Sequence, residues 1–387
     1  MYIVKYVTTS KHYIPLKYLF LKSLSVQRAV VSGLLMSSVH EIVLPLRVIV
    51  GNGAIHSLVA LLNEIKRKEP FRVGVVTGEN TYLVGGRLVE EIARGVGDVY
   101  VLKVRDPNVV TAERVADEAV DRRLDVLIGV GGGKAIDVAK YAGFKVGVPV
   151  ISVPLAPSHD GIASPFASLK GTDKPYSVKT RVPYAIVADT EIIARAPKRL
   201  ILSGIGDLLG KFVSVKDWRL AHKLRGEYYG EYAAQLALLS AKHALRYHEV
   251  IAKGAPEGIR ILVEALVSSG VSMCIAGSSR PASGSEHLFA HAIELLAPGK
   301  VLHGEAVALG SLIMLYIYGD PLWRKIKRVM KKIGLPTTAE ELGLPPEMLV
   351  KALQIAPTIR PERYTILGER ELSEEAAIKV LKDVGVI

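Results

Sequence analysis

Cysteine is almost absent from this chain of 387 residues, which contains only Cys274. A single thiol cannot form an internal disulfide, and it excludes zinc sites built from several cysteines. A chain of this length can bury a large core without such cross-links. Since a lack of disulfides is typical of a reducing compartment, we predict a cytoplasmic protein in which Cys274 is a small buried apolar residue.

Acidic residues are missing from positions 1–39, which carry five basic side chains. This composition is typical of a transit peptide, but it also fits a gene start placed too far upstream, with Met36 as the true first residue. We favour the second interpretation, because a globular pattern begins only near Glu41. Residues 1–39 are therefore expected to be an N-terminal extension.

Long apolar runs are missing as well: no window of about 18 residues is apolar and uncharged, so we expect no membrane span. The net charge of +12 suggests nucleic acid as a partner. However, the basic residues are scattered and lack interleaved aromatic side chains. The one dense basic run, at 324–332, is typical of a solvated helix face. Anionic cofactors and substrates explain the charge equally well, so we expect no nucleic-acid partner.

Short apolar strands alternate with helical patterns in the first half of the chain. This order predicts an α/β domain with a parallel, Rossmann-like sheet covered by helices on both faces. From residue 195 onward a helical period dominates, which predicts a mainly α-helical C-terminal domain. We expect a dinucleotide-binding domain at 40–194 and a helical metal- and substrate-binding domain at 195–387. The expected strands are 47–50, 71–76, 99–104, 126–130 and 148–154.

A glycine-rich segment, Gly-Gly-Gly-Lys-Ala-Ile-Asp at 131–137, follows one of these strands and begins a helix. Glycines let the backbone approach a phosphate, and the free N–H groups of a helix start attract it. The segment is no Walker loop, because Ala135 stands where Ser or Thr is required, and it is not the usual GxGxxG. It is compatible with a pyrophosphate site and also with an ordinary strand–helix turn.

The segment Ser-His-Asp-Gly-Ile-Ala-Ser-Pro at 158–165 lies just past the next strand. In open parallel sheets, ligands bind at the carboxyl ends of the strands, so this segment is a candidate ligand loop. A polar loop in which Asp160 makes a turn is the alternative. The spacing alone does not decide between the two.

Histidines are concentrated in one short stretch of the chain. His287 and His291 lie four residues apart, on one face of a predicted helix, and His303 follows twelve residues later. Upstream, Asp207 offers a carboxylate near a helix start. Imidazoles and a carboxylate suit Zn²⁺, and catalytic zinc sites usually have three protein ligands. These four residues are the candidate ligands, although histidines on an apolar face can also be plain packing residues.

Together these motifs resemble the iron-containing alcohol dehydrogenase and dehydroquinate synthase superfamily, and within it the sn-glycerol-1-phosphate dehydrogenase family. The string at 158–165 is the most specific part of the resemblance, which covers residues 40–387. It implies that Asp207, His287 and His303 bind the metal. It also implies that Asp160, Asp207 and His291 contact the substrate, with Asp160 and His291 as catalytic residues.

The resemblance also implies which residues bind the cofactor. These are Gly131, Gly132, Gly133, Lys134, Ala135, Ile136, Asp137, Leu155, Ala156, Pro157, Ser158 and Ser164. The family usually has Thr at position 155, so a hydroxyl contact to the cofactor is expected to be missing. Glu79 favours NAD(H), but the nearby basic residues Arg72 and Lys103 leave NADP(H) open.

The function implied is the NAD(P)H-dependent reduction of dihydroxyacetone phosphate to sn-glycerol 1-phosphate for archaeal-type membrane phospholipids. Zn²⁺ would polarise the ketone as a Lewis acid, and the protein is expected to be a homo-oligomer. Two enzymes of the same superfamily are alternatives: a glycerol or other polyol or alcohol dehydrogenase, and a dehydroquinate synthase-like enzyme. A non-catalytic protein that binds lipid surfaces or nucleic acid is a third.

Overall fold

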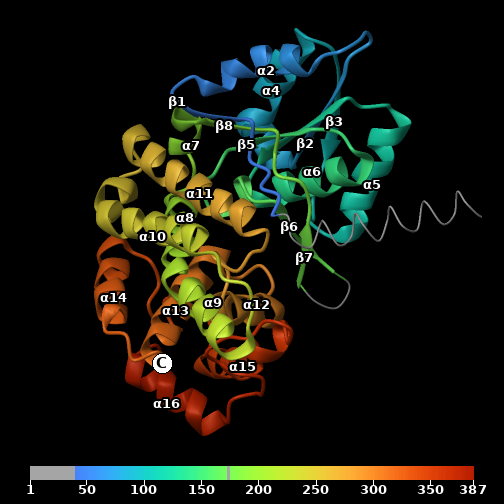
Figure 1. Ribbon diagram of the computed structural model, residues 1–387. Helices are drawn as coiled ribbons and strands as arrows, with labels where there is room; N and C mark the ends of the chain where they lie inside the picture. The colour runs from blue at the N-terminus through green and yellow to red at the C-terminus, as the bar shows by residue number, and fades with distance from the viewer. Residues whose placement is uncertain (1–39, 172–174) are drawn as a thin grey trace, which may run out of the picture. The chain divides into compact units, whose positions relative to one another are not determined.

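The computed structural model describes residues 40–171 and 175–387 (Figure 1). Residues 43–387 form one compact unit. The expectations for residues 1–39, namely an N-terminal extension and a start at Met36, lie outside the described residues.

A six-stranded parallel sheet forms the first part of this unit, with the strands in the order β1-β8-β5-β4-β2-β3. The inner strands β4, β5 and β8 are buried along their whole length, as is typical of a sheet covered on both faces. The strands are β1 (Arg47–Gly51), β2 (Arg72–Thr77), β3 (Asp98–Lys103), β4 (Val126–Gly131), β5 (Val150–Pro154) and β8 (Ala185–Asp189).

Helices cover both faces of the sheet because successive side chains of a strand point to opposite faces. Within β4, Ile128 packs in the cluster that contains the helices α2 and α4, whereas Leu127 packs in the cluster that contains α5 and α6. The elements of this part are η1 (Ala54–Ser57), α2 (Leu58–Ile65), α3 (Glu79–Thr81), the π-helical turn η2 (Tyr82–Gly86), α4 (Arg87–Arg94), α5 (Val109–Asp121) and α6 (Gly133–Val146).

The segment between β5 and the C-terminal helices contains three strands that the sequence patterns did not predict. Two form an antiparallel hairpin, β6 (Phe166–Lys170) and β7 (Pro175–Lys179). The third is β8, which pairs with both β1 and β5. β8 is a run of only four apolar residues, Ala-Ile-Val-Ala, before Asp189, and a run this short cannot be told from a buried helix segment by its pattern alone.

The rest of the chain is helical, which confirms the predicted fold class, an α/β part followed by a mainly α-helical part. Its core is one large apolar cluster. Whether a domain boundary falls at residue 194 stays a prediction. The helices are α7 (Thr190–Ala194), α8 (Lys198–Leu209), α9 (Lys211–Arg225), α10 (Glu231–Ala252), α11 (Pro256–Ala276), α12 (Ser285–Leu296), α13 (His303–Ile317), α14 (Leu322–Ile333), α15 (Pro346–Ile359) and α16 (Glu374–Val384).

Two of these helices concern the predictions about nucleic acid and membrane. The basic run lies on α14, whose apolar residues, such as Ile326 and Met330, are buried while Arg324, Lys325 and Arg328 face solvent. The solvated helix face is therefore confirmed. Within the described ranges, α11 alone is long and apolar enough to cross a membrane, but 67% of its most apolar window is buried inside the protein. Cys274, on the same helix, is buried as predicted.

Candidate active site

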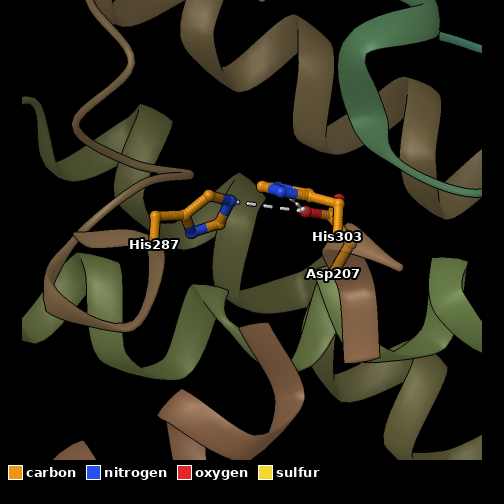
Figure 2. Close-up of side chains that lie close together, drawn as sticks. All are labelled: Asp207, His287 and His303. Atoms are coloured by element: carbon orange, nitrogen blue, oxygen red, sulfur yellow. Dashed lines mark ion pairs between the residues drawn. The ribbon is translucent and has the colours of Figure 1, made fainter. Parts of the chain in front are cut away.

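Three side chains from distant parts of the chain meet between α8, α12 and α13. Oδ1 of Asp207 lies 3.5 Å from Nε2 of His287 and 3.9 Å from Nε2 of His303. Figure 2 shows the His287 ring directed at the Asp207 carboxylate, with His303 close to the same carboxylate. One ligand atom from each residue lies within 4.8 Å of the others, so a single cation can contact all three.

Glycines explain how the helices come close enough for this cluster to form. A Cβ atom on Gly206 would lie 2.1 Å from the carbonyl oxygen of Gly304, and one on Gly304 would lie 1.8 Å from the carbonyl oxygen of Ser203. Any larger residue would separate the helices. Since Asp207 and His303 directly neighbour these glycines in sequence, the close contact of α8 with the start of α13 brings carboxylate and imidazole together.

Two glutamates behind the histidines set the direction of their rings. Nδ1 of His287 lies 2.6 Å from Oε1 of Glu286, and Nδ1 of His303 lies 2.7 Å from Oε1 of Glu294. A carboxylate is only an acceptor, so Nδ1 carries the proton in both rings. Nε2 of each ring then presents its lone pair to the cluster when the ring is neutral, which is the arrangement found in carboxylate–histidine–metal sites.

A second group of possible ligands shares His303 with the first and adds His291 and Glu294. The Glu294 carboxylate is already hydrogen-bonded to both histidines of this group, since it also accepts from Nδ1 of His291 at 2.9 Å through Oε2. We therefore interpret this second group as the hydrogen-bonded support of the first. It places the His291 ring beside the cluster, with its centroid 5.6 Å from that of His303.

Lys211 lies beneath the cluster and is completely buried. Its ammonium lies 2.9 Å from Oδ2 of Asp160 and 3.2 Å from Oδ1 of Asp207, and it donates a hydrogen bond to the carbonyl of Ala282 at 3.1 Å. These three acceptors match the three donors of an ammonium group. Lys211 is thus a structural counter-ion of two candidate site residues, and its position does not suit an additional role as a phosphate ligand.

The charges in the cluster depend on one another. Burial alone would raise the pKa of Asp207, but Lys211 and the two histidines outweigh it and hold that pKa well below its usual range. Burial also opposes a charge on His303, yet Glu294 and, more weakly, Asp207 raise the pKa of its imidazole to about 9. The Asp207 carboxylate is therefore ionised at neutral pH. When no metal is bound, the His303 imidazole carries a second proton and a positive charge.

The glycine-rich turn lies at the carboxyl end of β4, next to the loop that follows β5. Gly131 has a φ of 145°, a conformation that favours glycine, and its carbonyl accepts a hydrogen bond from the Leu155 amide at 2.9 Å. The helix α6 starts at Gly133, and no side chain caps it among the described residues. Its first N–H groups are thus the kind of donors that bind phosphate.

His159 connects this turn with the metal cluster. A Cβ atom on Gly133 would lie 1.8 Å from Nε2 of His159, so only glycine leaves room for the ring. Nδ1 of His159 accepts a hydrogen bond from the Gly161 amide at 3.0 Å, and its ring lies 6.2 Å from that of His303. Burial lowers the pKa of His159, so the ring is neutral with its proton on Nε2.

The loop from Pro157 to Phe166 is held in place by Lys140 of α6. This fully buried ammonium donates hydrogen bonds to the carbonyls of Gly161 (2.6 Å) and Phe166 and lies 2.8 Å from Oδ1 of Asp137. The Asp137 carboxylate therefore faces the interior rather than the glycine-rich turn. Ser164 is also turned inward, with its hydroxyl 3.2 Å from the Phe166 carbonyl.

The structure thus brings most of the predicted site residues together. Leu155, Ala156 and Pro157 are buried where the loop crosses the end of the sheet, and Ser158 is half-buried. In the glycine-rich segment, Lys134 is exposed, whereas Ala135 and Ile136 are buried in α6. Four residues that position the others were not among the predicted site residues, although each lies within or close to one of the predicted motifs: Lys140, His159, Glu286 and Glu294.

Comparisons with known proteins agree with this architecture. A family model described as iron-containing alcohol dehydrogenase matches residues 49–197. The structure of a glycerol dehydrogenase from Schizosaccharomyces pombe is similar, with a TM-score of 0.72 and 23% identity over 89% of this chain and 90% of that chain. A probable glycerol dehydrogenase from Sinorhizobium meliloti 1021 gives a TM-score of 0.71 at 21% identity, covering 89% and 98% of the two chains. The fold and the site define a protein of the iron-containing alcohol dehydrogenase class.

More similar relatives narrow the class to one family. A glycerol-1-phosphate dehydrogenase [NAD(P)+] from Staphylothermus marinus is 61% identical over 92% of this chain and 100% of its own length. A protein of the same name from Hyperthermus butylicus is 53% identical over 90% and 99% of the two chains. The chain belongs to the glycerol-1-phosphate dehydrogenase family.

Proposed function

We propose that this protein reduces dihydroxyacetone phosphate to sn-glycerol 1-phosphate with NADH or NADPH, for the synthesis of archaeal-type membrane phospholipids. The observation that carries the proposal is the position of the Asp207, His287 and His303 cluster. It lies beside the uncapped start of α6, with the His159 ring between the two. The names of the closely related proteins support this substrate and both cofactors.

The cluster fits a resident metal ion, for which we propose Zn²⁺. One carboxylate and two imidazoles with inward-facing Nε2 atoms form a three-residue donor set that leaves room for substrate oxygens. The same donors also suit Fe²⁺, so the identity of the metal needs its own measurement. When bound, the metal supplies Lewis-acid polarisation of the ketone, and the reduced nicotinamide supplies the hydride.

For the remaining site residues we propose roles in binding and proton transfer. Asp160 has its Oδ2 fixed by Lys211 and by the hydroxyl of Ser269, at 2.7 Å, so Oδ1 is the atom that accepts a substrate hydroxyl. Burial lowers the pKa of the His291 imidazole, and its Nδ1 donates to the Glu294 carboxylate, so Nε2 is the atom that takes up a proton from water and passes it to the reduced oxygen.

For the cofactor, we propose that the turn at 131–135 and His159 contact its phosphates, while 155–158 and Ser164 shape the nicotinamide end. Asp137 acts through Lys140 rather than by direct contact, because its carboxylate faces the interior. The homo-oligomer and the cytoplasmic location remain predictions, and so does the choice between NAD(H) and NADP(H).

The test is chiral analysis of the product formed from dihydroxyacetone phosphate with each reduced cofactor. We expect sn-glycerol 1-phosphate, with stoichiometric loss of absorbance from the reduced cofactor. Formation of the opposite enantiomer would overturn the proposed product. Rates with glycerol that exceed those with glycerol 1-phosphate would favour a polyol dehydrogenase instead. A reaction that recycles its cofactor without net consumption would favour a dehydroquinate synthase-like enzyme.

A further inference from the structure

A buried arginine without an acidic partner lies against the loop that joins α11 to α12. Arg363 is only 8% exposed. Its guanidinium donates hydrogen bonds to the Ser279 hydroxyl at 2.7 Å and to the Ser283 carbonyl, and both acceptors are neutral. In the part of the chain that the structure describes, no carboxylate forms an ion pair with Arg363. The side chain therefore carries a positive charge that the protein itself leaves unbalanced.

The neighbouring charges increase this imbalance. Glu227 already pairs with Arg280, and Glu362 pairs with Arg360 at 3.0 Å. Both nearby carboxylates are therefore already neutralised by another arginine. Burial, followed by repulsion from Arg360 and Arg280, lowers the pKa of Arg363. A guanidinium nevertheless stays charged at neutral pH. Three cations and two carboxylates thus leave one buried positive charge in excess.

Such an arrangement is costly unless something compensates for it. Burying an unpaired charge is strongly unfavourable even after local relaxation, and hydrogen bonds to a hydroxyl and a carbonyl offset only part of that cost. A guanidinium also has five N–H donors in a planar fork that matches the oxygens of a phosphate. An anion bound to Arg363 would restore the missing negative charge and use the remaining donors.

The loop connects Arg363 to the candidate metal cluster. The Ala282 carbonyl, next to Ser283 in sequence, accepts a hydrogen bond from Lys211, which in turn contacts Asp207. A second connection runs through Asp217, which accepts hydrogen bonds from the amides of Ile366 (2.8 Å) and Ser285 (2.6 Å). The segment that carries Arg363 is therefore fixed against the first turn of α12, on which His287 lies.

We propose that Arg363 binds the phosphate group of the substrate, a phosphomonoester dianion, and so selects phosphorylated over unphosphorylated ketones. This inference rests on the proposed function, since it concerns the far end of the same substrate. A triose phosphate carries its phosphate only a few bonds from the ketone, so phosphate and metal ligands must approach from adjacent elements. Lys211 does not suit this role, because all three of its donors are already engaged.

The kinetic test compares dihydroxyacetone phosphate with dihydroxyacetone in wild type and in Arg363→Met. We expect kcat/KM for the phosphorylated ketone to fall on the order of 100-fold, as for loss of a charge-assisted contact, with little change for dihydroxyacetone. Arg363→Lys should recover part of the loss. Arg87→Gln on α4, an exposed arginine paired with Glu91, is the matched control, and it should leave both substrates nearly unchanged. Equal losses with both substrates in Arg363→Met would overturn the proposal.

Stability measurements separate ligand binding from a structural role. Without ligand, Arg363→Met should raise the melting temperature, because it removes an uncompensated charge, whereas a purely structural arginine would give a decrease. Inorganic phosphate should raise the melting temperature of wild type but not of Arg363→Met. It should also compete with dihydroxyacetone phosphate. Competition with NADPH alone would instead assign the site to a cofactor phosphate and overturn the assignment to the substrate.

The two proposals fail in different ways. If wild type does not reduce dihydroxyacetone phosphate but phosphate still stabilises it through Arg363, the proposed function fails and the anion site stands. If wild type reduces dihydroxyacetone phosphate and Arg363→Met does so equally well, the anion site fails and the function stands.

Discussion

The carboxylate of Glu294 accepts a hydrogen bond from Nδ1 of His303 at 2.7 Å. This contact fixes the proton on Nδ1 and directs Nε2 toward Asp207. The other oxygen of the same carboxylate accepts from His291 at 2.9 Å. Glu294 thus orients both a proposed metal ligand and the proposed proton donor, although it acts as neither itself.

Replacing this glutamate should therefore weaken metal binding without unfolding the protein. For Glu294→Gln we expect the affinity for Zn²⁺ to fall by about 10- to 100-fold, the usual effect of losing a carboxylate behind a metal-bound histidine. Competition with a chelator of known affinity measures it. Glu264→Gln on α11, whose carboxylate is 52% exposed, is the control. Unchanged zinc affinity in Glu294→Gln would show that the contact does not support the site.

Metal binding should depend on pH because of the proton on His303. Burial disfavours that proton, but Glu294 raises the pKa of His303 from 6.5 to about 9, and a metal ion must displace it. Zinc affinity should therefore increase from pH 7 and level off above pH 9. In the metal-free protein, the raised pKa adds stability below pH 6.5 that is lost as the pH rises through 9. Proton release measured by calorimetry in several buffers checks this, and an affinity independent of pH would contradict it.

The buried pair of Lys140 and Asp137 should dominate the stability of the loop at 157–166. Lys140→Met leaves the Asp137 carboxylate buried without its cation, which should destabilise the protein by about 3–5 kcal/mol. The double variant Asp137→Asn with Lys140→Met should lose less than the sum of the single variants, because it removes both charges. Denaturant unfolding of the four proteins measures the coupling. Additive losses would mean that the two side chains act independently.

Gly133 should tolerate no side chain while His159 is present. A methyl group there would lie 1.8 Å from Nε2 of His159, so Gly133→Ala must displace either the ring or the start of α6. We expect it to lower the affinity for NADH and NADPH at least tenfold, about 1.4 kcal/mol. His159→Ala in the Gly133→Ala background should recover some of that affinity by making room. Titration of cofactor fluorescence measures both, and full affinity in Gly133→Ala alone would refute the proposed role of the turn.

The fold could be predicted from the sequence wherever burial makes apolar residues recur at the spacing of a helix or in the short runs of a buried strand. The strands β2 to β5 are apolar runs bounded by turns, and the helices beyond residue 195 repeat their apolar positions, so both were predictable. β8 was not predicted, since its short apolar run, Ala-Ile-Val-Ala, fits a strand and a buried helix segment equally until β1 and β5 pair with it. The hairpin of β6 and β7 likewise depends on pairing between its strands rather than on local composition.

The site was predictable only in part, for a similar reason. The spacing of His287 and His291 indicates a shared helix face, but nothing in the sequence brings Asp207 to them. That requires the contact between Gly206 and Gly304. The inward direction of the Asp137 carboxylate was hidden as well, because it depends on Lys140 and its burial. The supporting residues Glu286 and Glu294 lie next to or within one turn of predicted ligands, so adjacency to a histidine was the available signal.

The most direct test of the account is a metal titration of protein stripped by a chelator. Reduction of dihydroxyacetone phosphate is followed as Zn²⁺ is added to wild type and to the His287→Ala and His303→Ala variants. We predict no activity without metal, recovery in wild type that saturates at one equivalent per chain, and no recovery in either variant at that ratio. Full activity in the stripped protein, or in either variant, would contradict the metal site formed by Asp207, His287 and His303.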